Sequence, residues 1–134
     1  MYVIAPFVGA YMVLVALMTG SFINLAADRV PRRESVIHPR SHCRGCGRPL
    51  NVIDLLPVIG YALRGGRCAS CKTPIGFAAP LVEAVSGGLM LAPLLWLGLW
   101  PGGAAGIALV AIWGVLVTGV ALRRRGSPAT EPRI

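Results

Sequence analysis

The sequence is poor in acidic residues, with 5 Asp and Glu against 13 Lys and Arg in 134 residues and a net charge of +8 at pH 7. Charged residues of both signs make up only 13% of the chain, whereas hydrophobic residues make up 55%. A protein that is both basic and this apolar does not have the composition of a soluble globule, a disordered tail or a free-standing nucleic-acid-binding protein. We therefore expect no nucleic-acid partner.

Charged side chains are also absent from two long regions, residues 1–27 and residues 84–122. Crossing a bilayer takes about 20 apolar residues in a helix, so both regions are long enough. A Trp-Pro-Gly-Gly breaker divides the second region, and we expect two spans there, at 77–100 and 104–122. Because backbone groups in lipid must be hydrogen-bonded internally, the sequence predicts an all-α integral membrane protein with three transmembrane helices, the first at 1–27.

Lys and Arg are concentrated in the polar segment 28–76, which contains nine, and in the tail 123–134, which contains four. Cytoplasmic segments of membrane proteins are enriched in these residues. We therefore expect the polar segment and the tail to be cytoplasmic and the N-terminus to be outside. The lipid bilayer is the first predicted partner.

All four cysteines lie in the polar segment as two C-x-x-C pairs, Cys43, Cys46, Cys68 and Cys71. Two such pairs at this spacing are typical of four thiolates around one tetrahedral zinc ion, so we predict a structural, zinc-ribbon-like site. Two disulfides, a redox-active pair and an iron–sulfur centre are the alternatives. His38 and His42 are interpreted as ordinary loop residues, because four cysteines already complete a tetrahedral site.

The stretch between the two cysteine pairs, residues 51–66, predicts a short amphipathic helix. Asp54 is a candidate cap, Pro57 is tolerated in a first turn, and Gly65 or Gly66 suits the C-terminal stop. The apolar face of this helix packs either against the membrane spans or bilayer surface or within the zinc module, and the sequence does not choose between these.

Several further motifs occur in order around the cysteines, and together they resemble the N-terminal domain of the type IV prepilin peptidase/N-methyltransferase family over about residues 9–90. The residues concerned are Gly20-Ser21-Phe22-Ile23-Asn24-Leu25, Asp28-Arg29-Val30-Pro31, Glu34-Ser35, Pro39-Arg40-Ser41-His42-Cys43, Leu56-Pro57-Val58, Gly66-Arg67-Cys68 and Pro80-Leu81-Val82-Glu83. The resemblance implies a first membrane helix, a cytoplasmic tetracysteine loop and the start of a second helix, in a bacterial inner (plasma) membrane.

Full members of that family are membrane aspartic proteases that remove the leader of prepilins and pseudopilins, in type IV pilus and type II secretion systems. Many also methylate the new N-terminus with S-adenosylmethionine. Proteolysis in the family requires two aspartates, one of them in a Gly-x-Gly-Asp motif. This chain has only Asp28 and Asp54 and no such motif, and its third span continues into Arg123-Arg124-Arg125. We therefore expect no autonomous peptidase activity, since the reaction needs two carboxyls that share a proton.

The resemblance also supplies candidate contacts to a substrate or to S-adenosylmethionine, namely Glu83, Gly66 and Arg67. Glu83 is the single formal charge within a predicted span. The alternative role for Glu83 is structural, either pairing with a loop arginine or reaching the membrane interface.

Three functions remain open at this level. The first is a non-proteolytic module that acts in pilin processing with an aspartate-bearing membrane subunit or a prepilin, or that self-associates. The second is the S-adenosylmethionine-dependent methyltransferase half of a split enzyme. The third is a truncated or degenerate homologue without activity.

Overall fold

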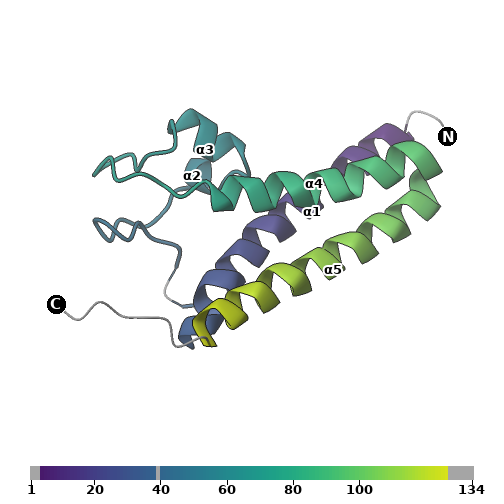
Figure 1. The fold of residues 1–134 in the computed structure, drawn as a ribbon. Coiled ribbons are helices and arrows are strands. Elements are labelled where there is room, and N and C mark those ends of the chain that lie inside the picture. The colour runs from purple at the N-terminus through teal and green to yellow at the C-terminus, as the bar shows by residue number, and fades with distance from the viewer. Residues whose placement is uncertain (1–3, 39, 127–134) are drawn as a thin grey trace.

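A computed structural model describes residues 4–38 and 40–126, in which three long helices form a bundle and a polar segment closes one end (Figure 1). The last eight residues of the expected tail, 127–134, lie outside the described residues. The long helices pack pairwise against one another. In chain order the elements are α1 (Ile4–Arg29), the 3-10 helix η1 (Val30–Arg32), α2 (Val52–Leu55), α3 (Ile59–Leu63), α4 (Ala78–Leu97) and α5 (Leu99–Gly126).

The helices α1, α4 and α5 are each long and apolar enough to cross a membrane. Large apolar side chains cover their outer surface: Phe7 is 72% exposed, Trp96 is 88% exposed and Val115 is 73% exposed. A helix surface of this kind is compatible with lipid and not with water. The predicted all-helical architecture with three apolar helices and an intervening tetracysteine segment is confirmed.

The break between the second and third long helices lies at Gly98, not at the expected 101–103 breaker. Gly98 has a φ of 80°, which favours glycine, and α5 begins at the next residue. Pro101 is therefore the third residue of α5, where its missing N–H has no intrahelical partner to lose. Gly102 fits the tight turn, because a Cβ there would lie 2.4 Å from the carbonyl oxygen of Pro93.

Small residues bring α1 and α4 into direct contact. A Cβ on Gly20 would lie 2.8 Å from the Cα of Glu83 and 2.7 Å from Oγ of Ser86, which is fully buried. A Cβ on Gly87 would likewise lie 2.7 Å from the Leu17 side chain. Close backbone approach through small residues is the usual basis of helix packing in membranes. The apolar core of the bundle comprises Ala16, Ile23, Val82, Met90 and Val110.

The variant Gly20→Ala is expected to destabilise the bundle by about 1–3 kcal/mol, because the added methyl meets backbone that cannot move aside. Gly9→Ala is the matched control, since a Cβ at Gly9 in the same helix meets nothing within 4 Å. The control gains helix propensity and should be neutral or stabilising. Reversible unfolding in detergent measures both, and equal stabilities of the two variants would contradict this account.

The polar segment contains two very short helices instead of the single amphipathic helix that the sequence predicts. Asn51 occupies the N-cap position of α2, and Asp54 lies at the third helical position, where it accepts a hydrogen bond from the Asn51 N–H (3.0 Å). Asp54 therefore caps α2 from the third helical position of a capping box, whereas Asn51 is the N-cap residue. The helix α2 ends at Leu55, and Val58, with a φ of 57° and a ψ of −47°, lies between it and α3.

Candidate metal centre and adjoining pocket

The two C-x-x-C segments fold into hairpins of the same design, offset by 25 residues. In the first hairpin the Cys43 N–H donates to the carbonyl oxygen of Arg48 (2.8 Å). In the second the Cys68 N–H donates to the carbonyl oxygen of Thr73 (2.9 Å). An isolated antiparallel bridge follows in each, His42 with Pro49 and Arg67 with Pro74. The same backbone hydrogen bond and the same bridge thus occur in both hairpins, and each hairpin supplies two of the four cysteines.

Each hairpin turns through a residue of positive φ at the same position. Gly47 has a φ of 72° and donates its N–H to the Cys43 carbonyl oxygen (2.8 Å). Lys72 has a φ of 59° and donates to the Cys68 carbonyl oxygen (3.2 Å). The left-handed region costs a non-glycine residue about 1 kcal/mol, so the second hairpin carries strain that the first avoids.

The four cysteine sulfurs lie within 4.8 Å of one another, and all four thiols are free. The Sγ atoms of Cys43 and Cys71 are 3.7 Å apart, and those of Cys46 and Cys68 are 4.0 Å apart. Tetrahedral zinc with bonds of 2.3 Å separates its sulfur ligands by about 3.8 Å, whereas a disulfide needs about 2 Å. The cluster therefore has the size of a single tetrahedral metal site, and the cysteines are not disulfide-bonded.

Hydrogen bonds from the hairpins favour thiolate at two of the four sulfurs. The backbone N–H of Cys71 lowers the pKa of Cys68 to about 6, and the Thr73 hydroxyl lowers the pKa of Cys71. At Cys46 the Arg48 N–H lowers the pKa, but burial and the neighbouring thiols outweigh it and raise the value to about 11. A bound cation would remove this conflict, because metal coordination deprotonates every thiol ligand.

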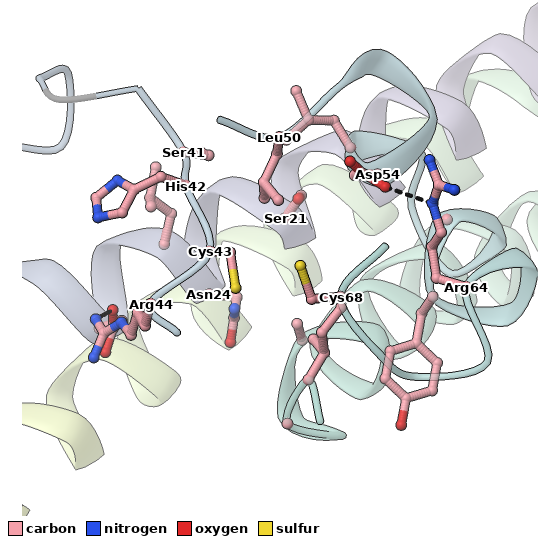
Figure 2. A pocket seen from close by; sticks show the side chains of 18 of the residues that line it. Ser21, Asn24, Ser41, His42, Cys43, Arg44, Leu50, Asp54, Arg64 and Cys68 are labelled. Atoms are coloured by element: carbon pink, nitrogen blue, oxygen red, sulfur yellow. Dashed lines mark hydrogen bonds and ion pairs between the residues drawn. The ribbon is translucent and has the colours of Figure 1, made fainter. Parts of the chain in front are cut away.

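A charged network lies beside the cluster (Figure 2). The Arg48 guanidinium, which also interacts with Cys68, donates to Oδ2 of Asp54 at 2.5 Å, and Arg64 Nε donates to Oδ1 at 2.7 Å. The Asp54 carboxylate is only 6% exposed. The Asn51 backbone N–H and these two arginines lower the pKa of Asp54 to about 2. The network joins the cysteine centre to both short helices.

The variant Asp54→Asn is expected to weaken this segment by about 1–2 kcal/mol near pH 7, because two arginines lose their charged partner. A depressed carboxyl pKa stabilises the fold above the unfolded value near 3.8 and loses that effect as pH falls towards 2. The difference between wild type and variant should therefore shrink over that range. Hydrogen exchange of residues 48–68 measures it.

Asp28→Asn provides the comparison for that experiment. Asp28 also pairs with two arginines, Arg32 (3.2 Å) and Arg44, but its side chain is 39% exposed. Solvent screens such a pair, so a smaller effect is expected. Identical pH profiles for wild type and Asp54→Asn would contradict the assigned role of Asp54.

An open pocket of about 830 Å³ lies between the cysteine hairpins, the two short helices and the adjacent ends of α1 and α4. Ser21 and Asn24 contribute to it from α1, and Figure 2 shows them among the lining residues together with Cys43 and Cys68. Glu83 of α4 also lines it. The pocket therefore connects the cysteine centre to the end of the membrane bundle.

Of the candidate contact residues, Arg67 and Glu83 line this pocket, whereas Gly66 does not belong to its lining. Gly66 has a structural role in the turn after α3. Its φ is 67°, its N–H donates to the Tyr61 carbonyl oxygen (3.0 Å), and a Cβ would lie 2.8 Å from the Tyr61 hydroxyl.

Glu83 is only 8% exposed, and its Oε2 accepts a hydrogen bond from the Val58 backbone N–H (2.7 Å). Val58 is the centre of a γ-turn in which the Ile59 N–H donates to the carbonyl oxygen of Pro57. A positive φ at the centre of a γ-turn is strained, the more so for a β-branched residue. Sequence reasoning did not identify Val58 as a partner of Glu83, since no local signal marks a γ-turn here.

The fold and site define a class of membrane protein in which three apolar helices hold a tetracysteine centre and a pocket at one end. Residues 14–97 match the family described as Bacterial Peptidase A24 N-terminal domain, and the chain belongs to this family.

Relatives carry this segment within longer proteins named Prepilin leader peptidase/N-methyltransferase. The chain is 35% identical to the one from Myxococcus xanthus (strain DK1622), with 66% of this chain and 27% of the relative covered. It is 34% identical to the one from Burkholderia pseudomallei (strain K96243), with 72% and 38% covered. It is 38% identical to the one from Bacillus subtilis (strain 168), with 57% and 31% covered. The chain thus spans about a quarter to two-fifths of these relatives, and no solved structure matches it significantly.

Proposed function

We propose that this chain is a zinc-stabilised membrane module for the processing of prepilins or pseudopilins, and that catalytic aspartates come from outside these 134 residues. The observation that carries the proposal is the tetracysteine centre at the mouth of a pocket that leads to the membrane helices. Homology to the N-terminal part of prepilin leader peptidases supports the substrate class. The module would present a substrate at the membrane surface to an aspartate-bearing subunit.

The surroundings of the two aspartates support a non-proteolytic role for the segment. Asp28 is bound by Arg32 and Arg44, and Asp54 is bound by Arg48 and Arg64. An acid–base pair requires two carboxyls that compete for one proton. Here each carboxylate is instead paired with two guanidinium groups, and those bound to Asp54 help to lower its pKa to about 2, which is too low for a general acid.

We place the module in the bacterial inner membrane with the cysteine centre in the cytoplasm. The basic residues of the polar segment lie at the end of the bundle where α5 finishes, next to η1, and α5 itself carries Arg123 and Arg124 there. The positive-inside tendency favours this end as the cytoplasmic one. A reducing compartment also agrees with four free thiols that bind a metal.

Zinc is the metal that fits four thiolates at these separations, and we expect one ion per chain. The variant Cys43→Ser should lose the ion and increase hydrogen exchange in residues 41–75, because metal binding organises the hairpins. Elemental analysis of the purified protein measures the stoichiometry. Ser70→Ala is the matched control, since it keeps the backbone N–H beside Cys68. Stoichiometric zinc in a variant without any of the four cysteines would refute the site.

The role in processing is tested by complementation. The part of the Myxococcus xanthus relative outside the matched segment would be co-expressed with this chain and a prepilin. We expect leader cleavage only when both pieces are present, and loss of cleavage when all four cysteines are replaced by serine. Absence of cleavage with both pieces present in the membrane would contradict the proposal. So would cleavage by this chain alone that disappears in Asp28→Asn or Asp54→Asn.

A second candidate function is binding of S-adenosylmethionine. The pocket is large enough for a cofactor of this size, and Arg67 and Glu83 offer charges that match its carboxylate and amino groups. A methyl-transfer assay separates the two candidates. Transfer of a labelled methyl group to a mature pilin N-terminus by this chain alone would favour the second.

A further inference from the structure

The two short helices of the polar segment present an apolar surface that nothing in the described residues covers. Val52 is 78% exposed, Ile53 is 49% exposed, Ile59 is 56% exposed and Leu63 is 66% exposed. These side chains therefore do not form the interior of the cysteine module, which was one of the two expectations from sequence. Exposed apolar side chains gathered on two neighbouring helices, here called the apolar patch, mark a contact with another protein or with a membrane.

The position of the patch along the membrane helix identifies which of these it contacts. With 20 residues, α4 is about 30 Å long, which equals the thickness of the hydrocarbon core. The whole of α4 is therefore needed to cross the core, and its first residue lies at the membrane boundary. Glu83 is the sixth residue of α4 and lies about 8 Å below its start. Because the Val58 N–H is hydrogen-bonded to Glu83, the turn between α2 and α3 lies beside the first turns of α4.

A second, independent contact fixes the position of α3 along the axis of α4. The ring of Tyr61 in α3 packs edge-on against Phe77, which immediately precedes α4, with ring centroids 6.1 Å apart. Figure 1 shows α2 and α3 beside the N-terminal end of α4, whereas the cysteine hairpins extend beyond it. Phe77 and Leu81 are themselves 65% and 50% exposed. The patch on α2 and α3 thus continues the lipid-facing surface of α4.

The side of the two short helices that faces the pocket carries a buried charge pair. Asp54 of α2 and Arg64, which follows α3, form their ion pair at the pocket wall. Segments with one apolar and one charged side that lie at this depth are typical of interfacial anchors, which reach about 5–10 Å into the boundary between headgroups and acyl chains.

We propose that residues 52–63 form an interfacial anchor that lies in the acyl-chain boundary of the bilayer beside α4. The hydrogen bond from Val58 to Glu83 holds the anchor at its depth, and the anchor in turn fixes the cysteine centre and its pocket at the membrane surface. The occupant of the apolar face is lipid. This inference depends on the membrane spans and not on the processing function proposed above.

The test uses tryptophan fluorescence of the full chain in phospholipid vesicles. Trp96, Trp100 and Trp113 are replaced by phenylalanine, and a single tryptophan is introduced as Leu63→Trp or, for the control, as Ser70→Trp in the second cysteine hairpin. Lipids brominated near the headgroup end of the acyl chain should quench most of the Leu63→Trp emission, and acrylamide should not. Ser70→Trp should show the reverse.

Two results would overturn the proposal. Acrylamide quenching of Leu63→Trp equal to that of Ser70→Trp would place the anchor in water. Blue-shifted emission that neither quencher reduces would show that protein, such as a second copy of the chain, covers the patch instead.

A second pair of variants tests the hydrogen bond that sets the depth. In the Leu63→Trp background, Glu83→Gln retains an oxygen acceptor for the Val58 N–H and should keep the quenching by brominated lipid. Glu83→Leu removes the acceptor and should lose much of that quenching while gaining acrylamide access. Unchanged quenching in both variants would show that Glu83 does not hold the anchor, whatever the outcome of the processing assay.

Discussion

The convergence of four cysteine sulfurs within 4.8 Å is the constraint on which the polar segment depends. Between the end of α1 and the start of α4, the described chain forms only short helices and isolated bridges. Cys68 and Pro57 are the apolar side chains of this segment that are buried in the described structure. Hydrophobic burial therefore contributes little there, and a metal held by the thiolates would supply most of the folding free energy.

Electrostatics links that centre to its surroundings. The chain has a large excess of arginine, and its two aspartates each bind two guanidinium groups at the edge of the pocket. Arg48 contacts both Asp54 and Cys68, so it balances charge between a carboxylate and a thiolate. A four-thiolate zinc centre carries a net charge of about −2, and nearby arginine compensates it. Arg48 therefore lies where it would balance part of the charge of such a centre.

The bundle and the polar segment are joined at Glu83. Its backbone packs against Gly20 of α1, and its carboxylate reaches the strained turn at Val58. A buried carboxylate within a membrane helix is costly unless it has a partner, and here the partner is a backbone N–H from the segment outside the bundle. Small residues at the helix contacts make this junction possible, since only glycine lets α1 approach so closely.

Much of this architecture could be predicted from the sequence, because the relevant signals are local. Apolar run length predicted the three helices, and the two C-x-x-C pairs predicted the four cysteines whose sulfurs lie together. Other features could not be predicted in this way. The sequence predicted the helix break at the Trp-Pro-Gly-Gly stretch, but it lies at Gly98, because a proline is tolerated in the first turn of a helix as well as in a loop. The residues from 51 to 66 have helical spacing, but the chain divides them at Val58.

The tertiary structure alone decided what Glu83 binds, where the short helices lie and how the pocket forms. These features arise from contacts between residues far apart in the chain, such as Val58 with Glu83 and Arg48 with Cys68. The sequence by itself determined which segments are apolar enough to span a membrane and which residues can bind metal. Hydropathy and cysteine spacing are properties of residues that lie close together in the chain. A strained γ-turn persists only when distant groups hold it in place, and no local pattern encodes that arrangement.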